Sequence, residues 1–217
     1  MLVRHYIYCH GPAALPRVKW QSKLRLRNEL KKRVVRAMGS TGAATEQEVA
    51  LALSGIYTES GKNLLALANA SPVLLIFLRH FGCSFCRQTI NQVADLSDEL
   101  AKRGVRPVFV HLGPPEIAKA NFDYYKLYDV ERINDPGAVV YQNPIFSLTR
   151  THPATHLANP AVWAGWLKGA IFKHGIGKIE GDGHQMPGIF FLKGPKIVRK
   201  FVHKNISDEP DYLRLVS

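Results

Sequence analysis

The stretch Pro72-Val-Leu-Leu-Ile-Phe-Leu-Arg-His-Phe-Gly-Cys-Ser-Phe-Cys-Arg87 decides the fold of this chain. Its first half is an apolar run with the length and the β-branched and aromatic content of a buried strand. Its second half places Cys83 and Cys86 three residues apart, and apolar residues then recur at helical spacing as far as Leu100. The sequence therefore predicts two thiols at the point where a central strand turns into a helix.

This position of the cysteines favours redox chemistry. Cys83 is expected to be exposed at the N-terminus of the helix, where unpaired N–H groups and the helix macrodipole stabilise a thiolate. Cys86 lies one turn further on, close enough to attack a mixed disulfide formed by Cys83. The pair is therefore predicted to be catalytic, and Arg79, Arg87 and His80 are candidates for lowering the pKa of the nucleophile.

Two other interpretations of the cysteines are weaker. Half of a zinc site would need two more ligands, and the third cysteine of the chain, Cys9, lies in a distant basic segment. His80 and His184 could complete a set of two cysteine and two histidine ligands for zinc, but structural zinc is usually held by two pairs of ligands that are each close in sequence. Two unreactive core cysteines would not need to stand between a strand and a helix. No metal is therefore expected.

Composition fits one globular domain in a reducing compartment. The chain has 217 residues, of which 46% are hydrophobic and 21% charged, as in ordinary soluble proteins. Its longest apolar run, residues 72–78, is too short to span a bilayer. Three cysteines do not make a disulfide scaffold, so a cytoplasmic location is expected.

The basic charge is concentrated at the N-terminus. Of the net charge of +12, residues 1–40 carry +9, and Glu29 is their one acidic residue. A short basic helix over residues 23–36 could contact RNA, an anionic membrane or an organellar import receptor, but a poorly ordered extension is favoured. We expect a basic extension over residues 1–42, a folded domain over residues 43–217, and no specific nucleic-acid partner. Weak contact with anionic surfaces through residues 1–40 remains an alternative.

Beyond residue 42 the sequence predicts alternating strands and helices. Strands are expected over residues 49–58, 105–112, 188–192 and 197–202, the last two as an antiparallel hairpin. Helices are expected over residues 64–67 after the cap Asn63, from Pro115, over 138–146, from Pro160 to Gly175, and over 208–215. The helix after the cysteines should end at residues 102–104. Trp163 and Trp166 are expected in the core, and residues 175–183 in a flexible glycine-rich loop.

Met186-Pro187 immediately precedes the first hairpin strand. Strand, CxxC, helix, strand and helix, followed by X-Pro, a hairpin and a terminal helix, is an order that resembles the thioredoxin fold. The resemblance implies that Pro187 is a cis proline packed beside Cys83 and Cys86. It also implies that Met186 offers backbone hydrogen bonds to an incoming disulfide or thiol.

A closer resemblance is to peroxiredoxin-like proteins of the AhpC/TSA type, in the branch of the selenoprotein U relatives. It is carried by residues 77–87, by Asp135-Pro136 and by residues 181–190, and it covers roughly residues 45–217. It implies a three-layer α/β/α fold with a central mixed sheet and an N-terminal β extension. It also implies a redox pair at Cys83 and Cys86, a substrate-binding Met186-Pro187 and no bound cofactor.

One departure from that family affects the chemistry. Typical peroxiredoxins carry P-x-x-x-T-x-x-C, whose cysteine attacks peroxide. If Cys86 takes that place, Cys83 stands at the Thr position and Arg79 at the Pro position. The groups that shape a peroxide pocket are therefore missing. The sequence does not decide which arginine would activate a thiol among Arg79, Arg87, Arg150 and Arg199.

The favoured function is a thiol–disulfide oxidoreductase with an antioxidant role, in which Cys83 is the nucleophile and Cys86 resolves the mixed disulfide. In the alternative, a thiol peroxidase, Cys86 attacks peroxide and Cys83 resolves the sulfenic acid. The expected partners are a protein disulfide or a peroxide, and a cellular thiol reductant. A third hypothesis is a non-catalytic binding module, but such a module would not need both the CxxC pair and Met186-Pro187.

Overall fold

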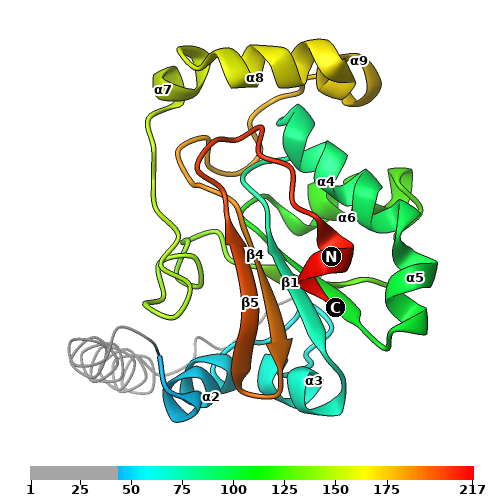
Figure 1. Ribbon diagram of the computed structural model, residues 1–217, viewed down its shortest axis with the longest axis vertical. Coiled ribbons are helices and arrows are strands. Elements are labelled where there is room, and N and C mark those ends of the chain that lie inside the picture. The colour runs from blue at the N-terminus through cyan, green and yellow to red at the C-terminus, as the bar shows by residue number, and fades with distance from the viewer. Residues whose placement is uncertain (1–43) are drawn as a thin grey trace, which may run out of the picture. The chain divides into compact units, whose positions relative to one another are not determined.

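The computed structural model describes residues 44–217, except for the side chains of residues 157, 168 and 169, and the predicted basic extension over residues 1–42 lies outside the described residues. In the described part, five strands form one mixed sheet in the order β3-β2-β1-β4-β5 (Figure 1). The strands are β1 (Val73–Phe77), β2 (Arg106–His111), β3 (Glu131–Asn134), β4 (Gly188–Lys193) and β5 (Lys196–Val202). β1 pairs in parallel with β2 and antiparallel with β4, so the strand that leads to the cysteines is central.

Helices cover both faces of this sheet. One face packs against α4 (Ser84–Asp95), α5 (Ser97–Lys102), α6 (Pro115–Tyr124) and α10 (Tyr212–Leu215). On the other side lie α2 (Glu46–Ser54), α3 (Leu64–Ala70) and the turn-rich residues 135–149. The predicted α/β/α layers around a mixed sheet are confirmed, and the fold is thioredoxin-like.

The central strand is apolar on both sides because it has a helical layer on each. All five side chains of β1 are at most 1% exposed. Side chains alternate between the two faces of a strand, so Leu74 and Ile76 join the core under α4, while Phe77 packs on the other face. The Phe77 ring contacts Tyr141 at 4.9 Å between centroids and Phe190 at 5.6 Å. Both layers therefore depend on this strand.

The predicted strand over residues 49–58 is wrong. Residues 46–54 form helix α2, whose N-cap Thr45 accepts a hydrogen bond from the Glu48 amide while the Glu48 carboxylate accepts one from the Thr45 amide. This capping box marks a helix start, and Val49 and Leu53 bury one face at a spacing of four. The expected N-terminal β extension is therefore not present in residues 44–72, where Tyr57 and Asn63 form only an isolated bridge.

Three smaller predictions also differ from the structure. Residues 138–146 form successive turns, because the Asp135 carboxylate accepts hydrogen bonds from two amides, those of Val139 and Val140, and closes the chain into a loop. The helix after the cysteines is broken at Leu96, where acidic residues in the first turn favour a new helix, α5. The terminal helix is only four residues long.

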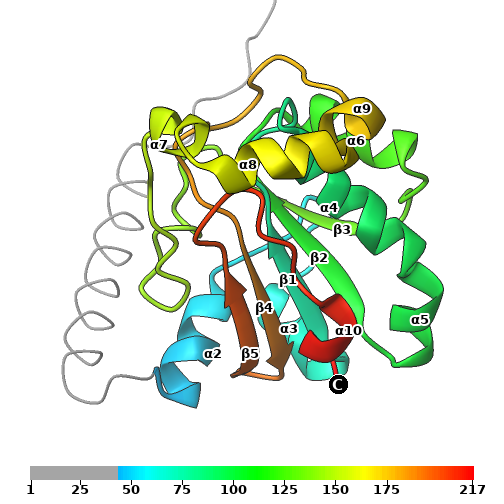
Figure 2. The same ribbon diagram turned by 45° about the horizontal axis from the view of Figure 1, so that its top comes forward.

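Other elements are confirmed. Asn63 caps α3, Pro115 opens α6, and β4 and β5 form the predicted hairpin. Asn159 caps a helical run made of α8 (Pro160–Gly165), the π-helical turn η1 (Trp166–Ala170) and α9 (Ile171–His174), which ends at Gly175 with φ +66°. With α7 (Pro153–Leu157), this run lies across one end of the domain (Figures 1 and 2). None of the helices between residues 44 and 217 has the length and apolarity needed to cross a membrane.

Candidate active site

Both cysteines lie at the carboxyl end of β1. Cys83 is the N-cap residue of α4, with extended backbone angles, and Cys86 lies in the first turn. Neither forms a disulfide. Cys83 is 7% exposed and Cys86 is 4% exposed. The prediction of an exposed Cys83 is therefore wrong, because surrounding loops and α8–η1 cover the head of the helix.

A buried arginine links the two thiols. The Arg79 backbone amide donates to the Cys86 sulfur at 3.4 Å, and its Nη1 lies 3.8 Å from the Cys83 sulfur. Its Nε donates to the Gln185 carbonyl at 3.0 Å, and Nη2 donates to the Gly183 carbonyl. Arg79 is only 4% exposed, and no carboxylate in residues 44–217 forms an ion pair with it. Its guanidinium contacts the Cys83 sulfur, which can carry a balancing negative charge as a thiolate.

The surroundings shift the pKa values of the two thiols in opposite directions. The pKa of Cys83 is lowered to about 6, first because the Cys86 thiol hydrogen-bonds to it, and further by the Arg79 charge and two helix N-terminal amides; burial opposes these effects. The pKa of Cys86 is raised well above its usual range by that same hydrogen bond and by burial. The surroundings therefore favour ionisation of Cys83 over ionisation of Cys86.

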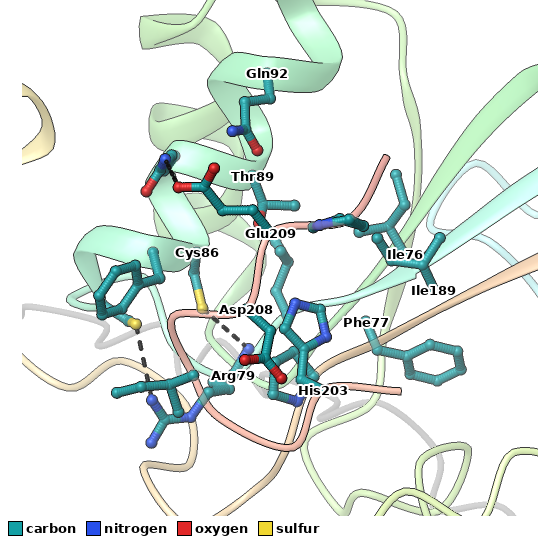
Figure 3. A pocket seen from close by; sticks show the side chains of 17 residues that line it. Ile76, Phe77, Arg79, Cys86, Thr89, Gln92, Ile189, His203, Asp208 and Glu209 are labelled. Carbon is teal, nitrogen blue, oxygen red and sulfur yellow. Dashed lines mark hydrogen bonds between the residues drawn. The ribbon is translucent and has the colours of Figure 1, made fainter. Parts of the chain in front are cut away.

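A pocket opens onto this pair (Figure 3). Its walls include both cysteines, Arg79, Pro187 and His203. β1 and β4 add apolar side chains, and α4 adds the polar Gln88, Thr89 and Gln92 besides Phe85. Asp208 and Glu209 come from the segment before α10. Nothing in the sequence pattern around His203 singled it out, since it lies after a hairpin strand and reaches the pocket only through the fold.

The structure places Pro187 at the pocket but gives Met186 another position. Met186 is 1% exposed and is not part of the pocket lining. Its amide donates to the Thr149 carbonyl at 3.0 Å, so this N–H is already used within the protein. The peptide bond before Pro187 is trans, as are the other peptide bonds of the described residues. The cis proline implied by the thioredoxin resemblance is therefore not found.

Of the four candidate arginines, only Arg79 touches the thiols. Arg87 donates to the Phe81 carbonyl at 2.6 Å and to the His174 carbonyl at 2.9 Å, so it joins α4 to α9. Arg150 pairs with Asp182. Arg199 bonds to carbonyls at the C-terminus. Their roles in the structure are to hold segments together.

Residues 175–183 are tied to the cysteine loop. The Gly177 amide donates to the Gly82 carbonyl at 3.0 Å, and the Phe81 amide donates to the Glu180 carbonyl at 3.1 Å. His80 and Gly181 form an isolated antiparallel bridge. The segment predicted to be a flexible loop is therefore hydrogen-bonded to the turn that carries Cys83.

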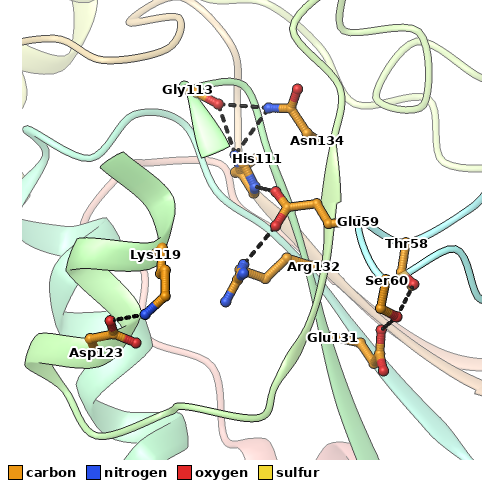
Figure 4. A network of polar contacts seen from close by, with 10 residues as sticks. All are labelled: Thr58, Glu59, Ser60, His111, Gly113, Lys119, Asp123, Glu131, Arg132 and Asn134. Carbon is orange, nitrogen blue, oxygen red and sulfur yellow. Dashed lines mark hydrogen bonds and ion pairs between the residues drawn. The ribbon is translucent and has the colours of Figure 1, made fainter. Parts of the chain in front are cut away.

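A second polar network supports this turn from the end of β2 (Figure 4). His111 is 1% exposed, and its Nε2 lies 2.8 Å from the Glu59 carboxylate, which also accepts from Arg132 at 3.0 Å. The His111 ring lies 5.4 Å from that of Phe81. Burial is the main cause of the lowered pKa of His111. The network therefore packs against Phe81 in the turn that carries Cys83, at a distance from the two thiols.

A metal site would need several ligand side chains close together. Within residues 44–217, no three His, Cys, Asp or Glu side chains converge in a way that could hold a metal ion.

No family model matches the sequence. The chain is 37% identical over 59 residues to a prostamide/prostaglandin F synthase from Salmo salar, a match that covers 27% of this chain and 28% of that protein. This chain therefore aligns with little more than a quarter of that relative's length.

Solved structures extend the comparison. The peroxiredoxin 6 of Arenicola marina has a TM-score of 0.52 at 11% identity, covering 74% of this chain and 66% of that one. The peroxidoxin BcpB of Mycobacterium tuberculosis has a TM-score of 0.48 at 14% identity, covering 70% of this chain and 82% of that one. The described domain thus has a thioredoxin-like fold, and a stretch of 59 residues is similar in sequence to prostamide/prostaglandin F synthase.

Proposed function

We propose that this protein is a thiol–disulfide oxidoreductase in which Cys83 is the nucleophile and Cys86 resolves the mixed disulfide. The observation that carries the proposal is the buried Arg79, whose Nη1 lies 3.8 Å from the Cys83 sulfur. A buried cation without a carboxylate partner is costly. A thiolate on Cys83 offsets this cost, so the site favours the reactive form of that cysteine.

The proposed reaction proceeds by two thiol exchanges. The Cys83 thiolate attacks one sulfur of a substrate disulfide, forms a mixed disulfide and releases the other substrate sulfur as a thiolate. Cys86 then loses its proton to solvent or to that thiolate and attacks the Cys83 sulfur. The second substrate thiol leaves, and the protein ends as a Cys83–Cys86 disulfide. Two thiols of a cellular reductant return the pair to its starting state, without a bound cofactor.

The raised pKa of Cys86 fits its role as the resolving thiol. Its main cause is the hydrogen bond to Cys83, and the negative charge on Cys83 adds to it. Both disappear once Cys83 is in a mixed disulfide, whereas the Arg79 amide and guanidinium remain. The pKa of Cys86 is therefore expected to fall at the step in which its thiolate is needed.

The test measures the ionisation of each thiol separately. Cys9→Ser removes the third cysteine, and Cys86→Ser or Cys83→Ser is added to it. We expect the variant that retains Cys83 to react with iodoacetamide along a titration curve with a pKa below that of an ordinary thiol, about 8.5. The variant that retains Cys86 lacks the hydrogen bond and the charge of Cys83, so the pKa of Cys86 should fall, but it should stay above that of Cys83 because burial still raises it. A low pKa at Cys86 instead, or ordinary values at both, would contradict the assignment of the nucleophile.

Peroxide reduction at Cys86 is the second candidate. The observation in its favour is the amide hydrogen bond from Arg79 to the Cys86 sulfur at 3.4 Å, which would stabilise a thiolate there. The raised pKa of Cys86 argues against it. If Cys83→Ser retains fast reaction with hydrogen peroxide and accumulates a sulfenic acid on Cys86, the peroxidase mechanism replaces the first one. A protein whose function survives loss of both thiols would be a binding module.

A further inference from the structure

The helical run α8–η1–α9 and the segment after it carry an unusual set of exposed apolar side chains. Val162 and Ala170 are buried against the domain, and the Trp166 ring stacks on that of Phe85. Other apolar side chains of the run and of the segment after it are exposed. Exposed fractions there are 52% for Trp163, 76% for Leu167, 82% for Phe172, 65% for Ile176 and 60% for Ile179. We call these five residues the apolar ridge.

Exposure on this scale needs an explanation. Single exposed apolar residues are normal, but a contiguous group on one segment marks a binding surface. Elsewhere in the described residues, exposed large apolar side chains are mostly tyrosines, or β5 and α2 residues close to 40% exposure. The ridge contains the most exposed Phe, Leu, Ile and Trp side chains of residues 44–217.

The charge around the ridge is mainly positive, with one acidic residue, Glu180, directly after Ile179. Residues 158–179 contain three lysines and no Asp or Glu. Lys173 is exposed. The Lys178 side chain is 85% exposed and pairs with Glu180 at 3.1 Å. Exposed ion pairs of this kind are weak, so Lys178 can also interact with another anion. His174 adds no positive charge at neutral pH, because burial lowers its pKa.

We propose that the apolar ridge docks on an anionic lipid surface. Segments that lie in a membrane interface combine Trp, Phe and Leu with lysines, and bind by burial of apolar side chains together with attraction to anionic lipids. The run lies across one end of the domain, so its outer side can approach a flat surface without a complementary groove (Figures 1 and 2). Residues 158–179 contain no acidic residue, and Glu180, which follows them, is paired with Lys178, so little repulsion from such a surface is expected.

Docking in this way would place the thiol pair beside the membrane. Trp166 stacks on Phe85, with 6.4 Å between the ring centroids, and Phe85 lies between the two cysteines in sequence and lines their pocket. The docking proposal does not depend on the redox function, since it rests on the ridge alone.

The experiment uses the full chain with Trp20→Phe, so that the remaining tryptophans, Trp163 and Trp166, report on the ridge. Binding is measured by co-sedimentation with phosphatidylcholine vesicles, with and without phosphatidylserine. We expect binding to the anionic vesicles, a blue shift of tryptophan emission, and quenching by brominated phosphatidylcholine. The Phe172→Ser/Ile176→Ser variant should bind at least about tenfold more weakly, because two interfacial anchors are lost.

Leu51→Ser/Tyr57→Ser is the matched control. It also removes two exposed apolar side chains, but from α2 and the segment after it. Its affinity should stay within about twofold of the parent, because neither residue is on the proposed docking surface. Cys83→Ser/Cys86→Ser should bind lipid normally, which separates this proposal from the redox function.

Three results would overturn the proposal. Equal lipid binding by the Phe172→Ser/Ile176→Ser variant (the ridge variant) and the parent would assign lipid binding to another region, such as the basic residues 1–40. Binding without bromide quenching would show that the ridge stays outside the bilayer. Self-association that the ridge variant abolishes, without lipid binding by the parent, would identify a second copy of this chain as the occupant.

Discussion

The Arg79 guanidinium lies 3.8 Å from the Cys83 sulfur, and it is held there by the backbone of a segment more than one hundred residues away. The carbonyls of Gly183 and Gln185 accept its other N–H groups. Arg79 therefore joins the end of β1, the head of α4 and the chain that leads into Pro187. Arg79 contacts both sulfurs, one through its amide and one through its side chain, and its charge favours a thiolate on Cys83.

Replacing Arg79 should make Cys83 a weaker acid. An opposite charge within about 4–6 Å typically lowers a pKa by about 1–3, so Arg79→Met should raise the pKa of Cys83 and slow its alkylation at neutral pH about tenfold or more. Arg79→Lys keeps the charge but not the forked geometry of the guanidinium, so the pKa of Cys83 in this variant should lie between its values in the parent and in Arg79→Met. The measurement is the pH dependence of iodoacetamide reaction in a Cys9→Ser/Cys86→Ser protein.

Arg150→Met is the control for this change. Arg150 pairs with Asp182 and has a half-exposed side chain, without contact to either sulfur. It should leave the alkylation curve unchanged. An equal effect of the two variants would mean that Cys83 responds to the net charge of the protein and not to Arg79.

The two cysteines should form a reversible intramolecular disulfide. Stabilising the reduced form as a thiolate makes a dithiol more oxidising, so we expect a potential between about −270 mV, as in thioredoxin, and about −120 mV. The measurement is thiol labelling of the Cys9→Ser protein across graded glutathione buffers, read by mass spectrometry. Failure of the pair to oxidise at any ratio would exclude the proposed reaction.

Burial of His203 should make the protein sensitive to acid. Burial lowers the pKa of His203 from 6.5 to about 4, so the unfolded chain binds a proton at this residue at a higher pH than the folded protein does. Stability from this group is fully present above about pH 6.5 and is lost as the pH falls toward 4. Between about pH 7.5 and pH 5 the loss should be about 2 kcal/mol, which urea unfolding at the two pH values can measure.

His203→Gln tests the source of this loss. The variant cannot titrate, so its free energy of unfolding should fall less steeply with acid. His184→Gln changes an exposed histidine and should behave like the parent. If His203→Gln and the parent lose the same stability on acidification, other buried groups, such as His80, cause the acid sensitivity.

The sequence predicts the layers of this fold because they depend on local patterns. The apolar run before Cys83 and the hairpin at 188–202 are confirmed, since each has a pattern that only a buried or paired strand explains. The strand predicted over residues 49–58 is wrong because apolar residues there are compatible with either element, whereas Thr45 and Glu48 form a capping box that starts a helix. β3 was not predicted because only Ile133 of its four residues is buried, so the sequence shows no alternation of apolar and polar residues there.

The site was less predictable than the fold. Cys83 and Cys86 stand out in the sequence, but the choice of Arg79 among four arginines depends on the Gly183 and Gln185 carbonyls that hold it. His203 enters the pocket by tertiary folding alone. The burial of Cys83 also depends on packing by η1, because Trp166 covers the neighbouring Phe85.

Gly82 should be irreplaceable at the turn before Cys83. A Cβ at this position would overlap the carbonyl oxygens of Gly177 and Lys178, which are backbone atoms that cannot rotate away. Gly82→Ala should therefore displace residues 175–183, break the bond from the Gly177 amide to the Gly82 carbonyl, and cost about 1–3 kcal/mol. We expect a lower melting temperature and faster proteolysis within residues 175–183. Gly55→Ala is the control, because its added Cβ would lie 3.8 Å from the nearest atom. If both variants melt like the parent and resist proteolysis equally, the segment does not pack against the cysteine turn as the structure describes.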